Sequence, residues 1–273
     1  MNAAKITRES KSNLALAFVS LSGERKRDIT TFYAFCRVID DIADSPTLDV
    51  VQKQEGLAAW RRMLRASEPN ALPLAADVRR LIDQYALAPE MLDEIIAGVE
   101  MDLTISRYTT FDELRVYCYR VASAVGLVSI EIFGYRDPAC KEYAIQLGLA
   151  LQATNIIRDV EKDLQNNRIY LPLEDLSRFG YSELDLQKRQ YNERFMRLME
   201  FQAARARGFF ARAAELLPDA DRKSMVAAEI MGSVYGGLLR KMERDRFRVF
   251  EKQYRLTTID KAGRVLWQLL KSI

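Results

Sequence analysis

Two clusters of aspartate at helical spacing are the residues of this chain best suited to chemistry. The first is Asp40-Asp41-Ile42-Ala43-Asp44, and the second places Asn155, Asp159 and Asp163 four residues apart. Residues four apart share one face of a helix, and like charges at that spacing destabilise an isolated helix by roughly 0.2–0.5 kcal/mol per pair. A bound cation would remove that repulsion. Mg²⁺ takes one or two carboxylates and fills its shell with water and phosphate oxygens. The pattern therefore predicts a site for Mg²⁺ and a diphosphate between two helices.

Each cluster also has a simpler interpretation. The segment 40–44 alone could be a solvated helix end before Ser45-Pro46, although acidic residues near a helix C-terminus oppose the helix dipole. The second cluster is harder to explain in this way, because Gln152 extends its polar stripe along an otherwise apolar helix. The two clusters together favour the metal site.

Basic and hydroxyl side chains near the clusters could bind phosphate. Four basic residues lie close to them in sequence: Arg37, Arg158, Lys162 and Arg168. The simpler role is an exposed ion pair within the helix, worth only about 0.3–0.5 kcal/mol, and it suits Lys162 best. Arg37 stands beside apolar residues one turn before the first cluster, which suits neutralisation of a leaving diphosphate. Ser10-Lys11-Ser12 could equally be a helix start capped by serine or a phosphate grip.

A tyrosine pair and an arginine, Tyr117-Cys118-Tyr119-Arg120, precede the small residues of 121–126. The small residues either permit close helix contact or leave room for a ligand. A tyrosine in such a helix can donate a hydrogen bond, move a proton, or place its ring beside a cation.

Composition narrows the chemistry. The 273 residues include 41 basic and 38 acidic side chains, and no histidine. The absence of histidine excludes Ser-His-Asp and Cys-His mechanisms and His-based metal sites. The nearly balanced charge does not indicate a nucleic-acid partner. Three cysteines without CxxC spacing indicate reduced thiols and a cytoplasmic protein. The residues 1–12 lack the apolar core that a signal peptide would have, and no transmembrane helix is predicted.

The elements that position these residues are expected to be helices throughout. Seven prolines divide the chain into segments in which apolar residues recur at three and four, and no segment alternates as strands do. We predict an all-α single domain over residues 1–273. Segments 121–135 and 143–157 are apolar on nearly every side, which places them at the bundle centre and gives an apolar cavity with an acidic mouth. Residues 165–181 are expected to form an ordered loop over the site. Helices are expected at about 4–20, 23–44, 49–66, 74–87, 90–102, 111–135, 138–164, 186–216, 221–247 and 259–272.

Together these segments resemble the squalene/phytoene synthase family of head-to-head prenyl synthases. The resemblance runs from Ser10-Lys11-Ser12 through Tyr33–Arg37 to Arg168-Ile169-Tyr170-Leu171-Pro172 and weakens after about residue 180. It implies an isoprenoid synthase bundle of helices around a central apolar cavity. The metal ligands that it implies are Asp40, Asp41, Asp44, Asn155, Asp159 and Asp163. It also implies a catalytic role for Tyr117 together with Asp40, Asp44, Asp159 and Asp163. The substrate contacts that it implies are Ser10, Lys11, Ser12, Tyr33, Arg37, Gln152, Asn155, Arg158 and Tyr235.

The run Arg120-Val121-Ala122-Ser123 is more similar to the bacterial presqualene diphosphate synthases of hopanoid pathways than to other branches, whereas Asn13 departs from the aromatic residue that often follows the serine pair. The resemblance thus implies Mg²⁺-dependent condensation of two farnesyl diphosphates to presqualene diphosphate, and onward to squalene if NADPH serves as reductant. The alternatives are a phytoene synthase that uses two geranylgeranyl diphosphates and a non-catalytic scaffold of the same fold.

The expected location is the cytoplasm, with peripheral contact at the inner face of the membrane as a further alternative. The segment 265–271 either packs on the core or lies as an amphipathic helix at the membrane surface. Contact with downstream isoprenoid enzymes is a further expectation.

Overall fold

The computed structural model describes residues 17–21, 23–66 and 72–271, and the regular elements of these ranges are all helical. The all-α prediction is confirmed, while the single-domain assignment stays a prediction. The expected helix at 4–20 lies almost entirely outside the described residues. The α-helices are α3 (Gly23–Asp44), α4 (Val50–Arg65), α5 (Pro73–Gln84), α6 (Pro89–Thr104), α7 (Phe111–Cys118), α8 (Ala124–Phe133), α9 (Cys140–Gln165), α10 (Leu173–Arg178), α11 (Glu183–Gln187), α12 (Glu193–Leu216), α13 (Val226–Arg244) and α14 (Thr258–Lys271). The shorter turns are η1 (Phe18–Ser20), the π-helical turn η2 (Tyr119–Ser123) and η3 (Asp219–Asp221).

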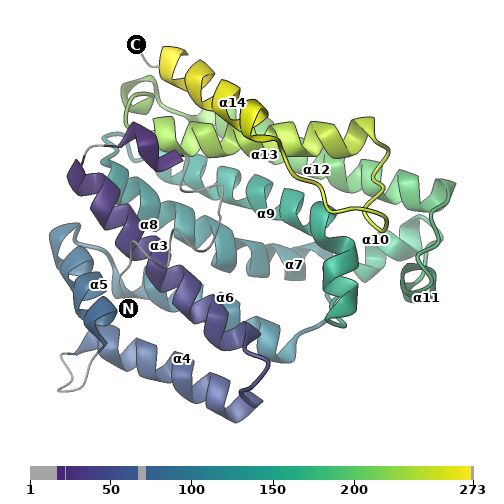
Figure 1. The fold of residues 1–273 in the computed structure, drawn as a ribbon, viewed down its shortest axis with the longest axis horizontal. Helices are drawn as coiled ribbons and strands as arrows, with labels where there is room; N and C mark the ends of the chain where they lie inside the picture. Colours follow the sequence, from purple (N-terminus) through teal and green to yellow (C-terminus); the bar gives the residue numbers. More distant parts are fainter. Residues whose placement is uncertain (1–16, 22, 67–71, 272–273) are drawn as a thin grey trace.

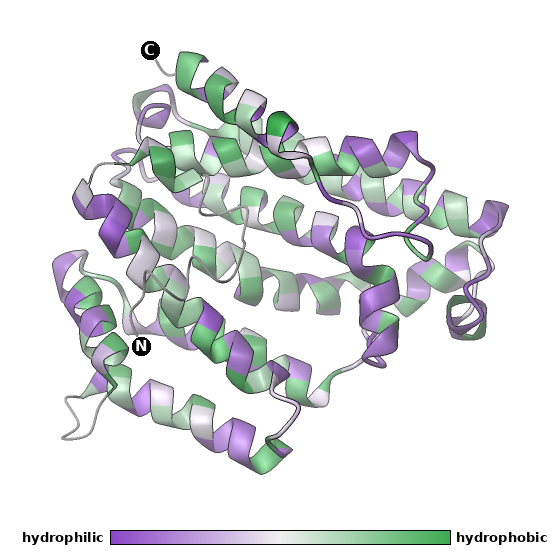
Figure 2. Cartoon of the chain, viewed as in Figure 1, coloured by the Kyte–Doolittle hydropathy of each residue, from purple (hydrophilic) through white to green (hydrophobic). Residues whose placement is uncertain are grey.

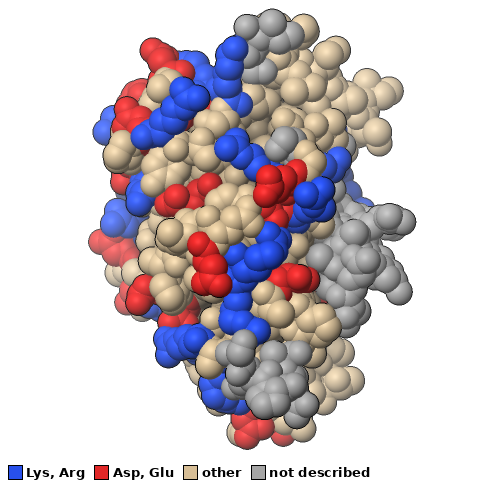
Figure 3. All heavy atoms as spheres, turned by 90° about the vertical axis from the view of Figure 1, so that its left-hand side faces the viewer, with Lys and Arg blue, Asp and Glu red and all other residues tan. Residues whose placement is uncertain are grey.

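The helices form a bundle with α8 and α9 in its middle. In Figure 1, α4 and α5 lie on one side of the molecule and α14 lies across α13 on the opposite side. Helix α9 packs against α12, α8, α13 and η2. Apolar residues dominate α8 and the first half of α9 (Figure 2), as expected for helices surrounded by others. On the face drawn in Figure 3, basic and acidic side chains are interspersed, so that face carries no large patch of one sign.

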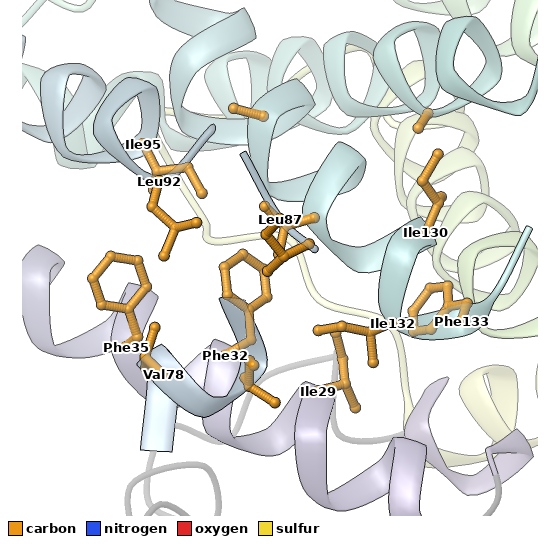
Figure 4. Packing of buried hydrophobic residues seen from close by; sticks show 14 of the residues in the cluster. Ile29, Phe32, Phe35, Val78, Leu87, Leu92, Ile95, Ile130, Ile132 and Phe133 are labelled. Atoms are coloured by element: carbon orange, nitrogen blue, oxygen red, sulfur yellow. The ribbon is translucent and has the colours of Figure 1, made fainter. Parts of the chain in front are cut away.

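One side of α3 is fixed by its apolar stripe. Figure 4 shows Ile29, Phe32 and Phe35 pointing from α3 toward side chains of α5, α6 and α8, among them Val78 and Leu92. All five are buried in one hydrophobic cluster. This packing orients α3, so that the polar residues of its last turns fall on a defined side of the bundle.

The closest helix contacts surround the turn η2. A Cβ atom on Gly148 of α9 would lie 2.6 Å from the Cα of Ser123, and a Cβ on Gly98 of α6 would lie 2.7 Å from the Cβ of Arg120. Ser123 is buried, and its Oγ donates a hydrogen bond of 2.8 Å to the carbonyl of Ile145. Only glycine permits such an approach, so the two glycines fix α6 and α9 against η2.

The structure corrects three expected boundaries. The expected helix 111–135 is a continuous helical run that ends at Phe133 and includes the π-helical turn η2 between α7 and α8. The expected loop 165–181 contains α10. The expected helix 186–216 is interrupted between α11 and α12, where Arg189 has a φ of 51°. The cause is local, because Ser182 and Asn192 each accept a backbone N–H and start separate helices.

The continuous helical run Phe111–Phe133 has the length and hydropathy of a membrane-spanning helix, which corrects the prediction that no segment qualifies. The same composition is typical of the core helix of a soluble bundle. Here the run packs against α6 and α9, and half of its most apolar window is buried within the structure.

We predict that Gly148→Ala lowers the free energy of unfolding by roughly 1–3 kcal/mol, because the new methyl group would press on the backbone of η2. Urea denaturation measures this loss. The matched control is Gly208→Ala in α12, where no atom lies within 4 Å of the added Cβ. That change should instead stabilise the helix by about 0.5–1 kcal/mol. Equal effects of the two substitutions would contradict the close-contact argument.

Candidate active site

Helix α9 joins an apolar cavity to a row of polar side chains. Leu147, Gly148 and Leu151 line a cavity of about 90 Å³. Asn155 follows Leu151 by one helical turn, and Asp159 follows Asn155 by another. The other lining residues come from η1, η2, α8, α9 and α13, and from Ala17 just before η1: Ala17, Phe18, Ala122, Val125, Gly126, Ser129, Ile130, Phe133, Tyr143, Ala144, Ala227, Ala228 and Met231.

The first aspartate cluster forms the last turn of α3. Arg37 makes an ion pair with Asp41 one turn later. Burial raises the pKa of Asp40 to about 7, the charges of Asp44, Asp102 and Asp41 add to the increase, and Arg37 opposes it. Asp40 nevertheless keeps accessible surface. Because Asp40 is exposed, its raised pKa reflects the protein atoms packed around the carboxyl together with the neighbouring charges.

The second cluster lies on the last turns of α9. Burial raises the pKa of Asp163 to about 7, and the charges of Asp159 and Asp102 increase it further. Asp159 is held by Arg158, whose Nε donates to Oδ1 at 2.8 Å, and Tyr235 of α13 also contacts Arg158. The second cluster is thus a mixture of paired and unpaired carboxyls.

Gln152 and Asn155 contact each other on α9. The Nδ2 of Asn155 donates to the Oε1 of Gln152 at 3.2 Å. The Oδ1 of Asn155 is buried and accepts no hydrogen bond from any described residue. A buried carbonyl oxygen without a donor is costly in a folded protein, and a hard cation would satisfy it.

The two clusters meet around Asp102, at the end of α6. Its charge raises the pKa of both Asp40 and Asp163. The pKa of Asp102 itself is raised mainly by burial, and the charge of Asp44 adds to this increase. Arg168 lies among these carboxyls. Its Nη1 is 3.7 Å from Asp44, and its Nη2 donates to the backbone carbonyl of Asp102 at 3.1 Å. The structure therefore brings both predicted motifs to one place.

The loop after α9 holds Arg168 and Tyr170 at this position. The backbone N–H of Ile169 donates to the carbonyl of Ser106 at 2.9 Å, and the Nη1 of Arg107 donates to the carbonyl of Asn167 at 2.6 Å. The predicted loop over the site is thus tied to the segment that follows α6.

Three tyrosine rings stack beside Asp102. The hydroxyl of Tyr117 donates to its Oδ2 at 3.0 Å, and that of Tyr170 donates to its Oδ1 at 2.6 Å. The rings of Tyr117 and Tyr170 lie 5.1 Å apart, and Tyr108 packs against both. Burial and the charge of Asp102 raise the pKa of Tyr117 well above its usual value. Tyr117 is therefore a neutral hydrogen-bond donor at physiological pH.

Sequence reasoning missed Asp102, although a signal was present. Asp102 lies in the last turn of α6, where an acidic side chain opposes the helix dipole, as Asp40 does in α3. Of the other predicted residues, Tyr33 packs its ring 6.5 Å from that of the cavity residue Phe18. Ser10, Lys11 and Ser12 lie outside the described residues.

The donor atoms suit a hard divalent cation. They are carboxylates and one amide oxygen, and histidine is absent from the chain. Within the described residues, no three Asp, Glu or Cys side chains stand close enough together to hold one metal ion. Mg²⁺ needs only one or two carboxylates when phosphate oxygens and water complete its shell, so the residues present fit this ion.

We predict that Asp163→Asn stabilises the metal-free protein. A carboxyl whose folded pKa is raised to about 7 destabilises the fold when charged, and this penalty shrinks as the pH falls from 8 toward 4. The variant should therefore gain roughly 1 kcal/mol at pH 8 and lose this advantage at low pH. Urea denaturation at several pH values measures it. Glu200→Gln, at an exposed position on α12, should change stability little at any pH.

Comparison with known proteins gives the family. A family model described as squalene/phytoene synthase matches residues 7–265. The phytoene synthase of Arthrospira platensis is 36% identical over 84% of this chain and 79% of its own length. The 15-cis-phytoene synthase of Synechocystis sp. is 34% identical over 91% of this chain and 78% of its own.

Solved structures agree with this result. A dehydrosqualene synthase crystallised with a ligand superposes with a TM-score of 0.88 at 26% identity, covering 99% of this chain and 96% of that one. The squalene synthase HpnC from Alicyclobacillus acidocaldarius has a TM-score of 0.81 at 24% identity over 90% and 93% of the chains, which shows a shared fold. With its acidic motifs gathered at one site, the chain belongs to the squalene/phytoene synthase family of prenyltransferases.

Proposed function

We propose that the protein condenses two molecules of farnesyl diphosphate head to head to give presqualene diphosphate. The observation that carries this proposal is the meeting of two acidic helix ends, from α3 and α9, around Asp102 and Arg168. The apolar cavity lies on the same helix α9, beginning one turn before Asn155. The diphosphate of one substrate would therefore lie at the acidic helix ends, and its hydrocarbon chain would lie in the apolar cavity.

The first chemical step is the departure of diphosphate from the donor. Mg²⁺ ions, each held by one or two of Asp40, Asp44, Asp159 and Asp163, with the Oδ1 of Asn155 as a further ligand, would supply electrostatic stabilisation to the leaving group. Three guanidinium groups lie near these carboxyls, on Arg37, Arg158 and Arg168. They can exchange part of their carboxylate contact for phosphate oxygens, which bind guanidinium groups in the same bidentate way.

The cavity would protect the allylic cation that results. Among the described residues, its lining has two hydroxyl groups, and both are engaged. The Oγ of Ser129 donates to the carbonyl of Val125 at 2.7 Å, and the hydroxyl of Tyr143 donates to Glu229 at 2.7 Å. An apolar lining without a free nucleophile would favour attack by the double bond of the second substrate over capture by water.

Bond formation between the donor cation and the acceptor double bond leaves a new cation, and loss of one proton closes the cyclopropane ring. The raised pKa of Tyr117 makes this residue a donor rather than the base. The released diphosphate is the base best placed to take the proton. Tyr117 would then orient that diphosphate or stabilise the cation through its ring.

Farnesyl diphosphate is proposed on the similarity of the run 120–123 to presqualene diphosphate synthases. The second candidate is synthesis of phytoene from two geranylgeranyl diphosphates. It is supported by the curated relatives named phytoene synthase at 34–36% identity. Onward reduction to squalene would require NADPH as an added reductant.

Product analysis tests the proposal. The full chain is incubated with Mg²⁺ and either farnesyl or geranylgeranyl diphosphate, with and without NADPH. Presqualene diphosphate from farnesyl diphosphate is the expected product without NADPH. Turnover of geranylgeranyl diphosphate alone would replace the first candidate by the second, and no turnover of either would favour a non-catalytic scaffold.

We predict that Asp40→Asn and Asp159→Asn each reduce turnover by at least about 10³-fold, because one ligand of the leaving-group site is lost. Chelation of divalent metal should abolish turnover of the unmodified protein, and added Mg²⁺ should restore it. Circular dichroism checks that the variants stay folded. Asp112→Asn at the start of α7, outside both clusters, serves as the control. Unchanged activity of the Asp40 variant would refute the metal assignment.

We further predict that Asp102→Asn lowers kcat by roughly 10–100-fold, because its carboxylate orients the hydroxyls of Tyr117 and Tyr170 beside the acidic clusters. Tyr170→Phe keeps the hydrogen bond between Tyr117 and Asp102 and should lose much less activity. Steady-state kinetics with the same diphosphate distinguishes the two. A larger loss in the Tyr170 variant would mean that Asp102 does not act through Tyr117.

A further inference from the structure

The C-terminal helix α14 is the most exposed amphipathic element of the described chain. It lies across α13 at the edge of the molecule (Figure 1), and none of its residues is buried. Val265 and Leu269 pack against the core. The opposite side carries large apolar residues that stay open to solvent: Ile259 (85% exposed), Leu266 (59%), Trp267 (59%) and Leu270 (58%).

Two neighbouring stripes run along α14, the first open to solvent and the second bordering α13. Residues 259, 263, 266 and 270 are spaced by four, three and four, and form an apolar stripe. Residues 260, 264, 267 and 271 repeat the same spacing one position later, and they are Asp260, Arg264, Trp267 and Lys271. An apolar stripe beside a stripe with tryptophan and basic residues is the arrangement of helices that lie at a membrane surface.

A basic pocket opens beside the second stripe, between α13 and α14. It has a volume of about 430 Å³ and is lined by five basic and two acidic side chains: Arg240, Lys241, Arg244, Lys252, Arg264, Asp245 and Asp260. The acidic groups are already engaged. Asp245 pairs with Lys252 at 2.6 Å, and Asp260 accepts hydrogen bonds from Thr257 at the start of α14.

The positive charge of this pocket is only partly matched, since Asp260 is the one described carboxylate whose charge acts on Arg264. Arg240, Arg244 and Arg264 form no ion pair with any described carboxylate. The guanidinium of Arg264 lies over Gly237, where a Cβ would be 2.3 Å from its Cζ. Its Nη1 donates to the carbonyl of Ser233 at 2.9 Å, whereas its buried Nε has no hydrogen-bond acceptor among the described residues. Burial and the charge of Arg240 lower the pKa of Arg264. The pocket thus carries more positive than negative charge, and Gly237 leaves the space that the guanidinium of Arg264 occupies.

We propose that α14 docks this protein on a bilayer that contains anionic phospholipids, with its apolar stripe among the acyl chains and a phosphate headgroup in the pocket of Arg240, Arg244 and Arg264. The charge of the pocket selects an anionic lipid surface over a neutral one. The pocket lies close to Trp267 along α14. A headgroup bound there would lie at the membrane–water interface, where tryptophan side chains are enriched.

Vesicle flotation of the full chain tests the proposal. Binding is expected to vesicles of phosphatidylcholine with phosphatidylglycerol, and to be at least roughly tenfold weaker with phosphatidylcholine alone. The chain has two tryptophans, and Trp60 is buried in the core. A blue shift of tryptophan emission on anionic vesicles therefore reports Trp267 entering the lipid. Equal binding to both vesicles, or none, would overturn the proposal.

Two double variants separate the contributions. Leu266→Ser with Leu270→Ser should weaken binding at least roughly tenfold, and Arg240→Glu with Arg244→Glu should remove the preference for anionic vesicles. The controls are Val51→Ser with Leu184→Ser, which changes apolar residues of comparable exposure elsewhere, and Arg212→Glu on α12. Control variants that bind as weakly as the α14 variants would overturn the assignment of the surface.

Two other occupants would give different results. If α14 pairs with a second copy of the chain, gel filtration without lipid shows a concentration-dependent dimer that the leucine variant abolishes. If the pocket serves free phosphate, inorganic phosphate alone shifts the emission of Trp267 and the vesicles add nothing. Either result contradicts the proposal.

Discussion

The arrangement of the site depends on how closely two helices approach the π-helical turn η2. Gly98 of α6 and Gly148 of α9 bring their backbones against Arg120 and Ser123. Asp102 lies one turn beyond Gly98, and Asn155 lies two turns beyond Gly148 on the same side of α9. This close contact therefore sets the distance from the acidic ends of α6 and α9 to Tyr117, which lies two residues before the first residue of η2.

The gathering of carboxyls at the candidate site works against the stability of the protein. Carboxyls from α3, α6 and α9 are crowded together with poor solvation, so the pKa values of Asp40 and Asp163 rise to about 7. Arg168 offsets only part of this repulsion. The apolar packing of α3 shown in Figure 4 holds the carboxyls in place despite the cost. Such local destabilisation is expected where a site must bind highly charged ligands.

Much of the fold and half of the site could be predicted from sequence. The period of apolar residues predicted the helices, because most of them bury one stripe, and the span 23–44 agrees with α3 at both ends. The spacing of Asp40, Asp159 and Asp163 predicted which faces would carry charge. These predictions succeeded because each depends on neighbours within one helix.

The features that sequence reasoning missed depend on contacts between helices. Asp102 becomes part of the site only because α6 ends beside α3 and the loop after α9. The pairing of Arg158 with Asp159 competes with its expected role toward diphosphate and could not be read from spacing. The turn η2 could not be predicted either, since the residues of 119–123 suit an ordinary α-helix and only packing against Gly98 and Gly148 favours the wider turn.

The turn η2 also determines how this chain tolerates changes in length. The N–H of Ala124 bonds to the carbonyl of Tyr119, five residues back, so the turn holds one residue more than an α-helix would. One residue corresponds to about 100° of rotation in a helix of 3.6 residues per turn. Deleting one residue here would leave a regular α-helix in which the part after the deletion is rotated by about 100° relative to the part before it. Either Tyr117 would leave Asp102, or Gly126 would leave Ala144 of α9. A single-residue deletion in this unbroken helix should therefore be tolerated less well than one in the loops at its ends.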